Sequence, residues 1–333
     1  MSEVRSFCST LAPFISDYLQ LKRALGRGYA NEERILQLAD SFLGRTGSDL
    51  TSESFAQWCL TQDYKTSGVR RSQMRIVRNL CLYRERREPN CFVPDLSEFP
   101  PLHQPVRPYI FRESEIAALI RATDTLKSSS GCPLRRETYR LAIVLLYTTG
   151  LRRGELLELR IRDYDPREHT LLIRESKFHK SRLLALSADG VREIAAYLGT
   201  RRHAGLPTSD ECHLLWNRYK GGKGYTGTGL SGTLKKLFRL TGIRKPNGKQ
   251  PRVHDLRFTF AAHALMRWYR SGADVRAKLP FLATYMGHVS IVSTEYYLHW
   301  SEDILAAASD RFAQRCSALV TVETMGGGNG FLQ

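Results

Sequence analysis

Apolar residues recur at helical spacing through the first part of the chain. Four stretches between residues 10 and 88 each carry an apolar stripe, and the first contains Leu11, Phe14, Ile15 and Tyr18. Because side chains three and four positions apart lie on one face of a helix, each stripe predicts a helix with one buried side. We therefore predict a domain of four helices over residues 10–88.

The helical pattern stops at a proline-rich stretch. Residues 89–108 contain six prolines. Proline lacks a backbone N–H group and its ring blocks helix formation, so this stretch is expected to be a semi-extended linker. We place the boundary between two domains here, which agrees with the length of 333 residues, since a domain has on the order of 150.

The pattern beyond residue 109 again predicts mostly helices, with one exception. Residues 141–146 are almost all apolar, which indicates a buried central helix. His169–Arg174 and Arg182–Leu186 are short apolar runs around a polar turn, which is typical of a β-hairpin. The predicted fold class is therefore mainly α with a small β-sheet. Other helices are expected near residues 113–122, 135–148, 191–198, 230–240, 254–269, 281–286 and 293–300, and residues 316–333 form a C-terminal tail.

The charge of the chain changes the functional picture. The formal net charge is +17, with 14 Lys and Arg against 12 Asp and Glu in residues 1–105 but 36 against 21 in the rest. An excess of Lys and Arg favours a polyanionic partner, because each phosphate contact releases counterions. The larger domain is therefore expected to supply most of the attraction to nucleic acid.

Composition also argues against other classes of protein. No apolar run approaches the roughly 18 residues that a membrane span needs, and the first residues lack the pattern of a secretion signal. The seven cysteines are scattered, with no CxxC pair, which argues against a disulfide framework and a structural zinc site. We expect a cytoplasmic protein without a metal or another cofactor.

Several residues that carry chemistry have ordinary explanations when each is considered alone. Arg152 in TTGLRRGELLEL could cap a helix, and Lys177 in RESKFHKSRLLAL is typical of a surface turn. His254 and Arg257 form HxxR, a common pairing on one helix face. His288 follows a glycine at a helix end, and Tyr297 in STEYYLHW has the spacing of a core tyrosine.

Taken in order, these residues form a specific pattern. The chain resembles the tyrosine recombinase family, which includes the phage lambda integrase and the bacterial Xer recombinases. The resemblance covers residues from about 10 to 315 and is strongest in TTGLRRGELLEL, HDLRFTF and YMGHVSIVSTEYYLH. It implies a SAM-like core-binding domain over residues 10–88 and a catalytic domain over residues 109–315, which clamp DNA as a C.

The same resemblance implies the roles of individual residues. Tyr297, which precedes x-His, would be the nucleophile. Glu155 would orient Arg152, and His299 would support the tyrosine helix. Phe258 replaces a histidine of many relatives, and the stretch from Ser271 to His288 resembles recombinases of mobile elements. The implied catalytic residues are Arg152, Lys177, His254, Arg257, His288 and Tyr297.

This set of residues suits transfer of a DNA strand. Two arginines can hold the non-bridging oxygens of a phosphodiester with paired donors that stay charged. Tyr297 would attack phosphorus and form a 3′-phosphotyrosine, while His254 accepts the phenol proton and Lys177 protonates the leaving 5′-oxygen. Because the covalent bond retains the phosphodiester energy, the reaction requires neither ATP nor a metal.

Other basic residues are candidates for contact with the DNA backbone. One group lies on the outer face of the helix near residues 69–87, where the alternative is a solvated face. The rest lie at the hairpin turn, in a glycine-rich loop and on the helix after it. The candidates are Arg70, Arg71, Arg75, Arg78, His179, Lys180, Lys220, Lys223, Lys235 and Lys236.

Two other functions remain open at the level of sequence. A type IB topoisomerase would relax DNA as a monomer, and a non-catalytic accessory protein could use the same fold. The complete set of catalytic residues favours a recombinase. The resemblance implies that the partner is double-stranded DNA with specific recombination sites, bound by a homotetramer or a mixed recombinase tetramer. Residues 301–333 could link the subunits, and packing of that segment on its own domain is the alternative.

Overall fold

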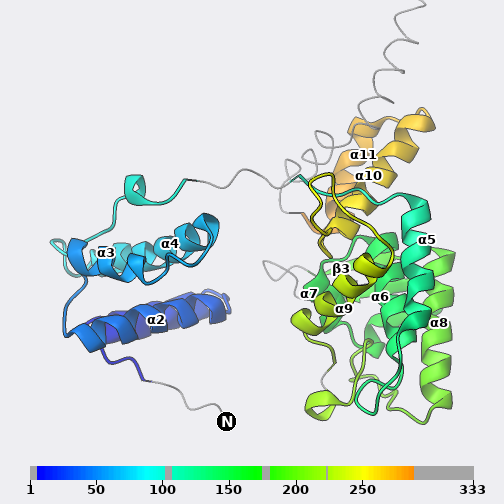
Figure 1. The fold of residues 1–333 in the computed structure, drawn as a ribbon, viewed down its shortest axis with the longest axis horizontal. Helices are drawn as coiled ribbons and strands as arrows, with labels where there is room; N and C mark the ends of the chain where they lie inside the picture. Colours follow the sequence, from blue (N-terminus) through cyan, green and yellow to red (C-terminus); the bar gives the residue numbers. More distant parts are fainter. Residues whose placement is uncertain (1–5, 102–106, 175–180, 223, 289–333) are drawn as a thin grey trace, which may run out of the picture. The chain divides into compact units, whose positions relative to one another are not determined.

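The computed structural model describes residues 6–101, 107–174, 181–222 and 224–288. It divides into two compact units, Met1–Val106 and Arg107–Gln333. Among the described residues helices predominate and a single small sheet is present (Figure 1). The predicted fold class, mainly helical with a small β-sheet, is confirmed.

Within residues 6–101 the first unit has four α-helices and a short 3₁₀ helix. They are α1 (Ala12–Ala24), α2 (Ala30–Thr46), α3 (Ser52–Leu60), α4 (Ser67–Arg84) and η1 (Leu96–Glu98). The apolar stripes face a common core that includes Ile15, Leu36, Phe55 and Leu80. Helix α2 packs against α1, α3 and α4, and α4 also packs against α1, so the helices share one core.

The second unit is built around α6, whose apolar run is buried as predicted. The side chains from Leu141 to Leu146 are at most 5% exposed, and α6 packs against α5, α7, α8 and α10. The helices of this unit are α5 (Glu113–Ala122), η2 (Thr123–Thr125), α6 (Arg135–Thr149), α7 (Arg153–Glu158), η3 (Ile161–Asp163), α8 (Ala188–His203), η4 (Tyr219–Gly221), α9 (Gly227–Leu240), α10 (Asp255–Arg270) and α11 (Val275–Met286).

The sheet is antiparallel in the order β1 (Tyr164–Asp165), β2 (Thr170–Ile173) and β3 (Arg182–Ala185). Thr170 pairs with Ala185 and Ile173 pairs with Arg182, which confirms the two predicted hairpin strands. Strand β1, two residues long, was not predicted from the sequence. The register places Arg182 at the first pair of β3, and β3 also contacts α11.

Helix α11 begins earlier than the sequence pattern indicates. The expected helix covers residues 281–286, but α11 starts at Val275 and contains Pro280. Proline removes one donor from a helix interior and usually marks a boundary. The Asp274 side chain accepts a hydrogen bond from Ala277 N at 3.2 Å, so a capped N-terminus supports the added turn.

Candidate active site

Arg152 follows the end of α6 because the chain turns sharply there. Gly150 ends α6 with φ of +62°, and a Cβ at this position would collide with the Phe260 ring. Only glycine meets both conditions without strain. Arg152 then occupies the N-cap of α7 in an extended conformation, where its backbone N–H donates to the Glu155 carboxylate at 2.9 Å.

Three arginines meet at the C-terminal turn of α11. Arg182 Nε donates to the Tyr285 carbonyl at 2.8 Å, Arg257 Nη2 to the Met286 carbonyl at 2.6 Å, and Arg152 Nη2 to the Gly287 carbonyl at 2.6 Å. The last carbonyls of a helix lack partners within it, and this end of the helix is electronegative. Guanidinium groups from three separate elements therefore cap three successive carbonyls, directly before His288.

The carboxylate of Glu155 binds two of these arginines, Arg152 and Arg182. It accepts from Arg152 Nη1 at 2.7 Å and from Arg182 Nη1 and Nη2 at 3.0 and 2.8 Å. The Glu155 side chain is only 7% exposed. Burial alone would raise its pKa, but the hydrogen bonds and positive charge of Arg182 and Arg152 lower the pKa to about 2.

We predict that Glu155 stabilises the fold in a pH-dependent way. Its pKa is lower in the folded chain than in the unfolded one, so its contribution is complete above about pH 4.5 and is lost as pH falls toward 2. The shift corresponds to about 3 kcal/mol. Urea unfolding of the Glu155→Gln protein from pH 6 to pH 3 is expected to show a weaker acid dependence than the wild type.

Glu193→Gln is the matched control, because Glu193 also accepts a forked pair of hydrogen bonds from an arginine, Arg140. Its side chain is more exposed, at 21%, and removal of such a pair is expected to cost about 1 kcal/mol or less. Parallel loss of stability with acid in the wild type and the Glu155→Gln protein would contradict the assignment.

Arg257 is the most enclosed of the three arginines. It is 2% exposed, and its Nη1 donates to the Gly150 carbonyl at 2.5 Å, in addition to the bond with Met286. The end of α6 and the end of α11 are thus joined through one guanidinium group. The positive charge of Arg257 has a fixed position, as transition-state stabilisation requires.

Two histidines border this arginine group. Burial is the main cause that lowers the pKa of both His254 and His288 to about 4, and the charge of Arg257 is the second cause for each. Both imidazoles are therefore neutral near pH 7 when no anion is bound. The ring of Phe258 meets the ring of His254 edge to face at 5.2 Å, so the residue that departs from the family pattern packs against His254.

A buried carboxylate fixes the N-terminus of α10. Asp255 is fully buried and pairs with Lys245 at 3.1 Å and with Arg252 at 2.9 Å. Its Oδ2 also accepts from Arg252 N at 2.9 Å. Because both partners satisfy the carboxylate, it can be buried without a large penalty, and it holds the turn that carries His254 and Arg257.

The structure thus brings together Arg152, Glu155, His254, Arg257 and His288 from the predicted set. The other predicted residues Lys177, His179, Lys180, Lys223, Tyr297 and His299 lie outside the described residues, and of Lys220 only the backbone is described, in η4. Their roles stay predictions.

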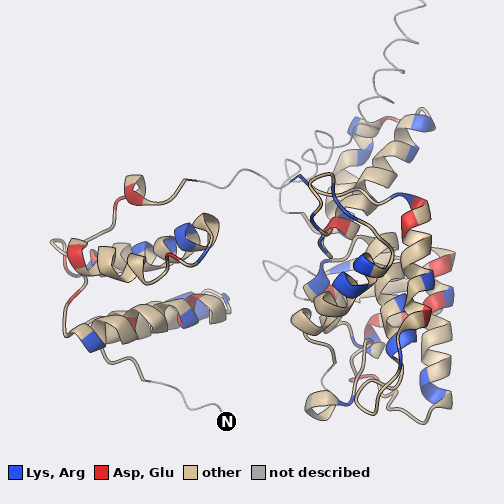
Figure 2. Ribbon diagram, viewed as in Figure 1, with Lys and Arg blue, Asp and Glu red and all other residues tan. Residues whose placement is uncertain are grey.

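The basic face of α4 is partly occupied by contacts within its own unit. Arg71 Nη1 donates to the Pro100 carbonyl at 2.6 Å, Arg78 Nε donates to the Pro94 carbonyl at 3.0 Å, and Arg70 pairs with Asp63 at 2.9 Å. Arg71 and Arg78 hold the segment around η1 against α4, whereas Arg70 binds a residue that follows α3. Arg75 is exposed, as are Lys235 and Lys236 on α9, and Figure 2 shows Lys and Arg along that helix.

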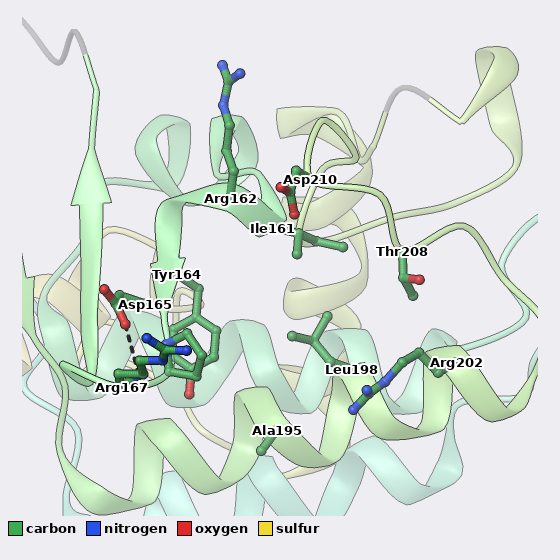
Figure 3. Close-up of a pocket in the computed structure, with 11 residues that line it drawn as sticks. Ile161, Arg162, Tyr164, Asp165, Arg167, Ala195, Leu198, Arg202, Thr208 and Asp210 are labelled. Carbon is green, nitrogen blue, oxygen red and sulfur yellow. Dashed lines mark hydrogen bonds between the residues drawn. The ribbon is translucent and has the colours of Figure 1, made fainter.

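Two cavities lie near the sheet. One, of about 760 Å³, is lined by Arg152 and Glu155 together with basic residues that include Arg160, Arg162 and Arg174, so it opens beside the arginine group. The other, of about 730 Å³, lies between the η3–β1 segment and α8, where Tyr164 and Leu198 form part of its wall (Figure 3). Only the first adjoins predicted site residues.

In the described part of the chain, the His, Cys, Asp and Glu side chains form no cluster of three or more that could hold a metal ion. No helix in the same residues is both long enough and apolar enough to cross a bilayer.

Comparison with known proteins places the chain in a family. Residues 110–303 match the model of the phage integrase family. The chain is 30% identical over 314 residues to y4rB of Sinorhizobium fredii, whose name assigns it to the integrases and recombinases; the match covers 92% of this chain and 98% of y4rB. The chain therefore belongs to the phage integrase family of tyrosine recombinases, enzymes that cleave and rejoin DNA at specific sites.

Solved structures show the same fold. The XerH site-specific recombinase in a post-cleavage complex with its palindromic difH substrate gives a TM-score of 0.61 at 17% identity, covering 92% of this chain and 97% of XerH. The Tn1549 transposon integrase in complex with transposon right end DNA gives 0.59 at 16% identity, covering 90% and 99%. The helical first unit and the sheet-bearing second unit therefore belong to a known architecture.

Proposed function

We propose that this recombinase cleaves DNA through Tyr297, which forms a 3′-phosphotyrosine and frees a 5′-hydroxyl group. The observation that carries the proposal is the meeting of Arg152 and Arg257 at the end of α11, next to His288. Tyr297 lies nine residues further along the chain. A phosphodiester held by the two guanidinium groups would have its non-bridging oxygens neutralised, and more charge develops on them in the transition state.

The proposed proton transfers use groups with suitable protonation states. His254 is neutral near pH 7, because its pKa is lowered to about 4, and it can accept the phenol proton. His288 is neutral for the same reason and can donate a hydrogen bond to a phosphate oxygen. Lys177 would protonate the leaving 5′-oxygen, and the reverse reaction with a different 5′-hydroxyl would rejoin the strands.

For DNA binding, we propose that the two units hold the duplex between them as a clamp, and that four protomers assemble on two sites. Arg75, Lys235 and Lys236 are exposed and available for phosphate contacts. Arg70, Arg71 and Arg78 could reach DNA only if their contacts within the unit were shared or exchanged. The remaining contacts would come from His179, Lys180, Lys220 and Lys223.

We further propose that the recombinase serves a mobile element. What supports this proposal is the stretch from Ser271 to His288, which resembles that of mobile-element recombinases. Sequencing the DNA that flanks the gene tests this proposal: inverted or direct repeats at two junctions support it, and a flank without junctions opposes it.

The covalent step can be tested with a suicide substrate. A duplex made from a junction sequence, nicked just 3′ of the cleavage position, loses its short 5′-hydroxyl fragment after attack and cannot be rejoined. We expect the wild type to accumulate a denaturation-resistant complex with the labelled 3′-phosphate side of the cut, without metal and in the presence of EDTA. Release of a free 3′-phosphate end without protein would contradict the proposal.

A further inference from the structure

We propose that Arg182 is a positioning residue for the strand-transfer site, which acts by holding Glu155 and the C-terminal turn of α11 in place. The inference rests on the proposed function, because that function assigns the groups that Arg182 positions. Arg182 begins β3 at the base of the hairpin and pairs with Ile173, and no pattern in the sequence singled it out.

All three guanidinium nitrogens of Arg182 are bonded to protein acceptors. Nη1 and Nη2 form a fork on the two oxygens of Glu155, and Nε donates to the Tyr285 carbonyl. Its side chain is 10% exposed, compared with 26% for Arg152. With all three nitrogens bonded within the protein, Arg182 is placed to hold Glu155 and the Tyr285 carbonyl, and its side chain is less exposed than that of Arg152.

The side chain of Arg182 contacts both Glu155 and the C-terminal turn of α11. Through Glu155 it is connected to Arg152, since the same carboxylate oxygen accepts from Arg152 Nη1 and Arg182 Nη1. It also packs on the turn before His288: a Cβ at Gly287 would lie 2.7 Å from Arg182 Nη1. Gly287, with φ of +68°, therefore leaves the space that Arg182 occupies.

Arg182 lies at the start of β3, where the hairpin meets Glu155 and the end of α11. It is five residues from Lys177 along the chain. The fork restricts the direction of Glu155 as well as its distance, which a single point charge would not do. Displacement of a reacting group by about 1 Å can cost about 10²-fold in rate, so a small loss of order here would be visible in catalysis.

Two Arg182 variants separate geometry from charge. Arg182→Gln removes the positive charge and the forked hydrogen bonds. Arg182→Lys keeps the charge but cannot bond both Glu155 oxygens and the Tyr285 carbonyl at once. In single-turnover assays on the suicide substrate at saturating DNA, we expect each variant to lower the rate of covalent complex formation about 10- to 100-fold. The DNA concentration that gives half-maximal binding should change less than about twofold, since all three guanidinium nitrogens of Arg182 are bonded to protein acceptors.

Arg140→Gln is the control for a purely structural effect. Arg140 forms a comparable fork on Glu193, through Nε and Nη2, between α6 and α8. We expect this variant to cleave at nearly the wild-type rate. A wild-type rate in the Arg182→Gln protein, or equal losses in the Arg140→Gln and Arg182→Gln proteins at equal thermal stability, would overturn the proposal.

A second readout does not depend on catalysis. Arg182 is one of the charges that lower the pKa of His288. NMR titration of histidine-labelled protein, with His288→Gln to assign the signal, should show a higher His288 pKa in the Arg182→Gln protein and little change in the Arg182→Lys protein. An unchanged His288 pKa in the Arg182→Gln protein would oppose the proposal. If the wild type formed no covalent complex while this shift was present, the proposed function would fail, and only the placement of Arg182 beside His288 would stand.

Discussion

The Tyr297→Phe protein is expected to bind its DNA site and to leave no covalent complex. The substitution removes one oxygen atom, the proposed nucleophile, and keeps the ring that would pack on its surroundings. Loss of a covalent nucleophile typically lowers a rate by roughly 10⁴-fold or more, which would place the product below detection. The measurement is electrophoresis of the protein with labelled suicide substrate under denaturing conditions, with DNA binding checked separately by gel shift.

The neighbouring tyrosine supplies a matched control. Tyr296→Phe makes the same chemical change one position earlier and is expected to form the covalent complex at close to the wild-type rate. Trapping by the Tyr297→Phe protein at the wild-type rate would mean that another residue attacks. If the Tyr296→Phe protein alone lost activity, the nucleophile would be Tyr296.

Arg152→Ala is expected to lower the rate of DNA cleavage about 10²- to 10³-fold. Arg152 would donate to a non-bridging oxygen on which charge develops, and loss of one such donor typically costs about 3–4 kcal/mol of transition-state stabilisation. The substitution also removes the hydrogen bonds that Arg152 donates to Glu155 and to the Gly287 carbonyl. Single-turnover cleavage at saturating DNA measures the effect on the chemical step apart from binding.

Two comparisons make the Arg152 prediction specific. Arg153→Ala removes the adjacent arginine, whose Nη1 bonds Ser231 at 2.8 Å, and is expected to change the rate at saturating DNA less than about threefold. Arg152→Lys keeps the charge without the paired donors and is expected to remain at least about tenfold impaired. Equal rates for the Arg152→Ala and Arg153→Ala proteins would argue against Arg152 as a phosphate ligand.

Much of the fold could be predicted because the spacing of apolar residues along the chain indicates which side chains are buried. The run at residues 141–146 predicted a central helix, and α6 is that helix. Two short apolar runs on either side of a polar turn predicted β2 and β3, because this pattern is typical of a β-hairpin. Family blocks, rather than periodicity, brought Arg152, His254, Arg257 and His288 into one hypothesis, and the structure brings these residues close together.

The features that the sequence did not predict depend on distant partners. Arg182 stands at the start of an apolar strand, and its importance is visible only when Glu155 and Tyr285 lie beside it. In the sequence, Arg71 and Arg78 have the pattern of a solvated helix face. The carbonyls that they bind belong to the proline-rich segment, so the pattern of the helix alone does not reveal them. The first turn of α11 was missed because Pro280 suggests a break that the fold tolerates.

The capped end of α11 also limits how far the chain beyond it can reach. His288 follows a turn that is bonded to arginines of three elements, so that point is anchored to the body of the second unit. Tyr297 lies nine positions further along the chain. A fully extended backbone of that length spans at most about 32 Å between Cα atoms, so whichever protomer's DNA is cut, the Tyr297 Cα must lie within that radius, and the phenol oxygen within that radius plus the length of its side chain.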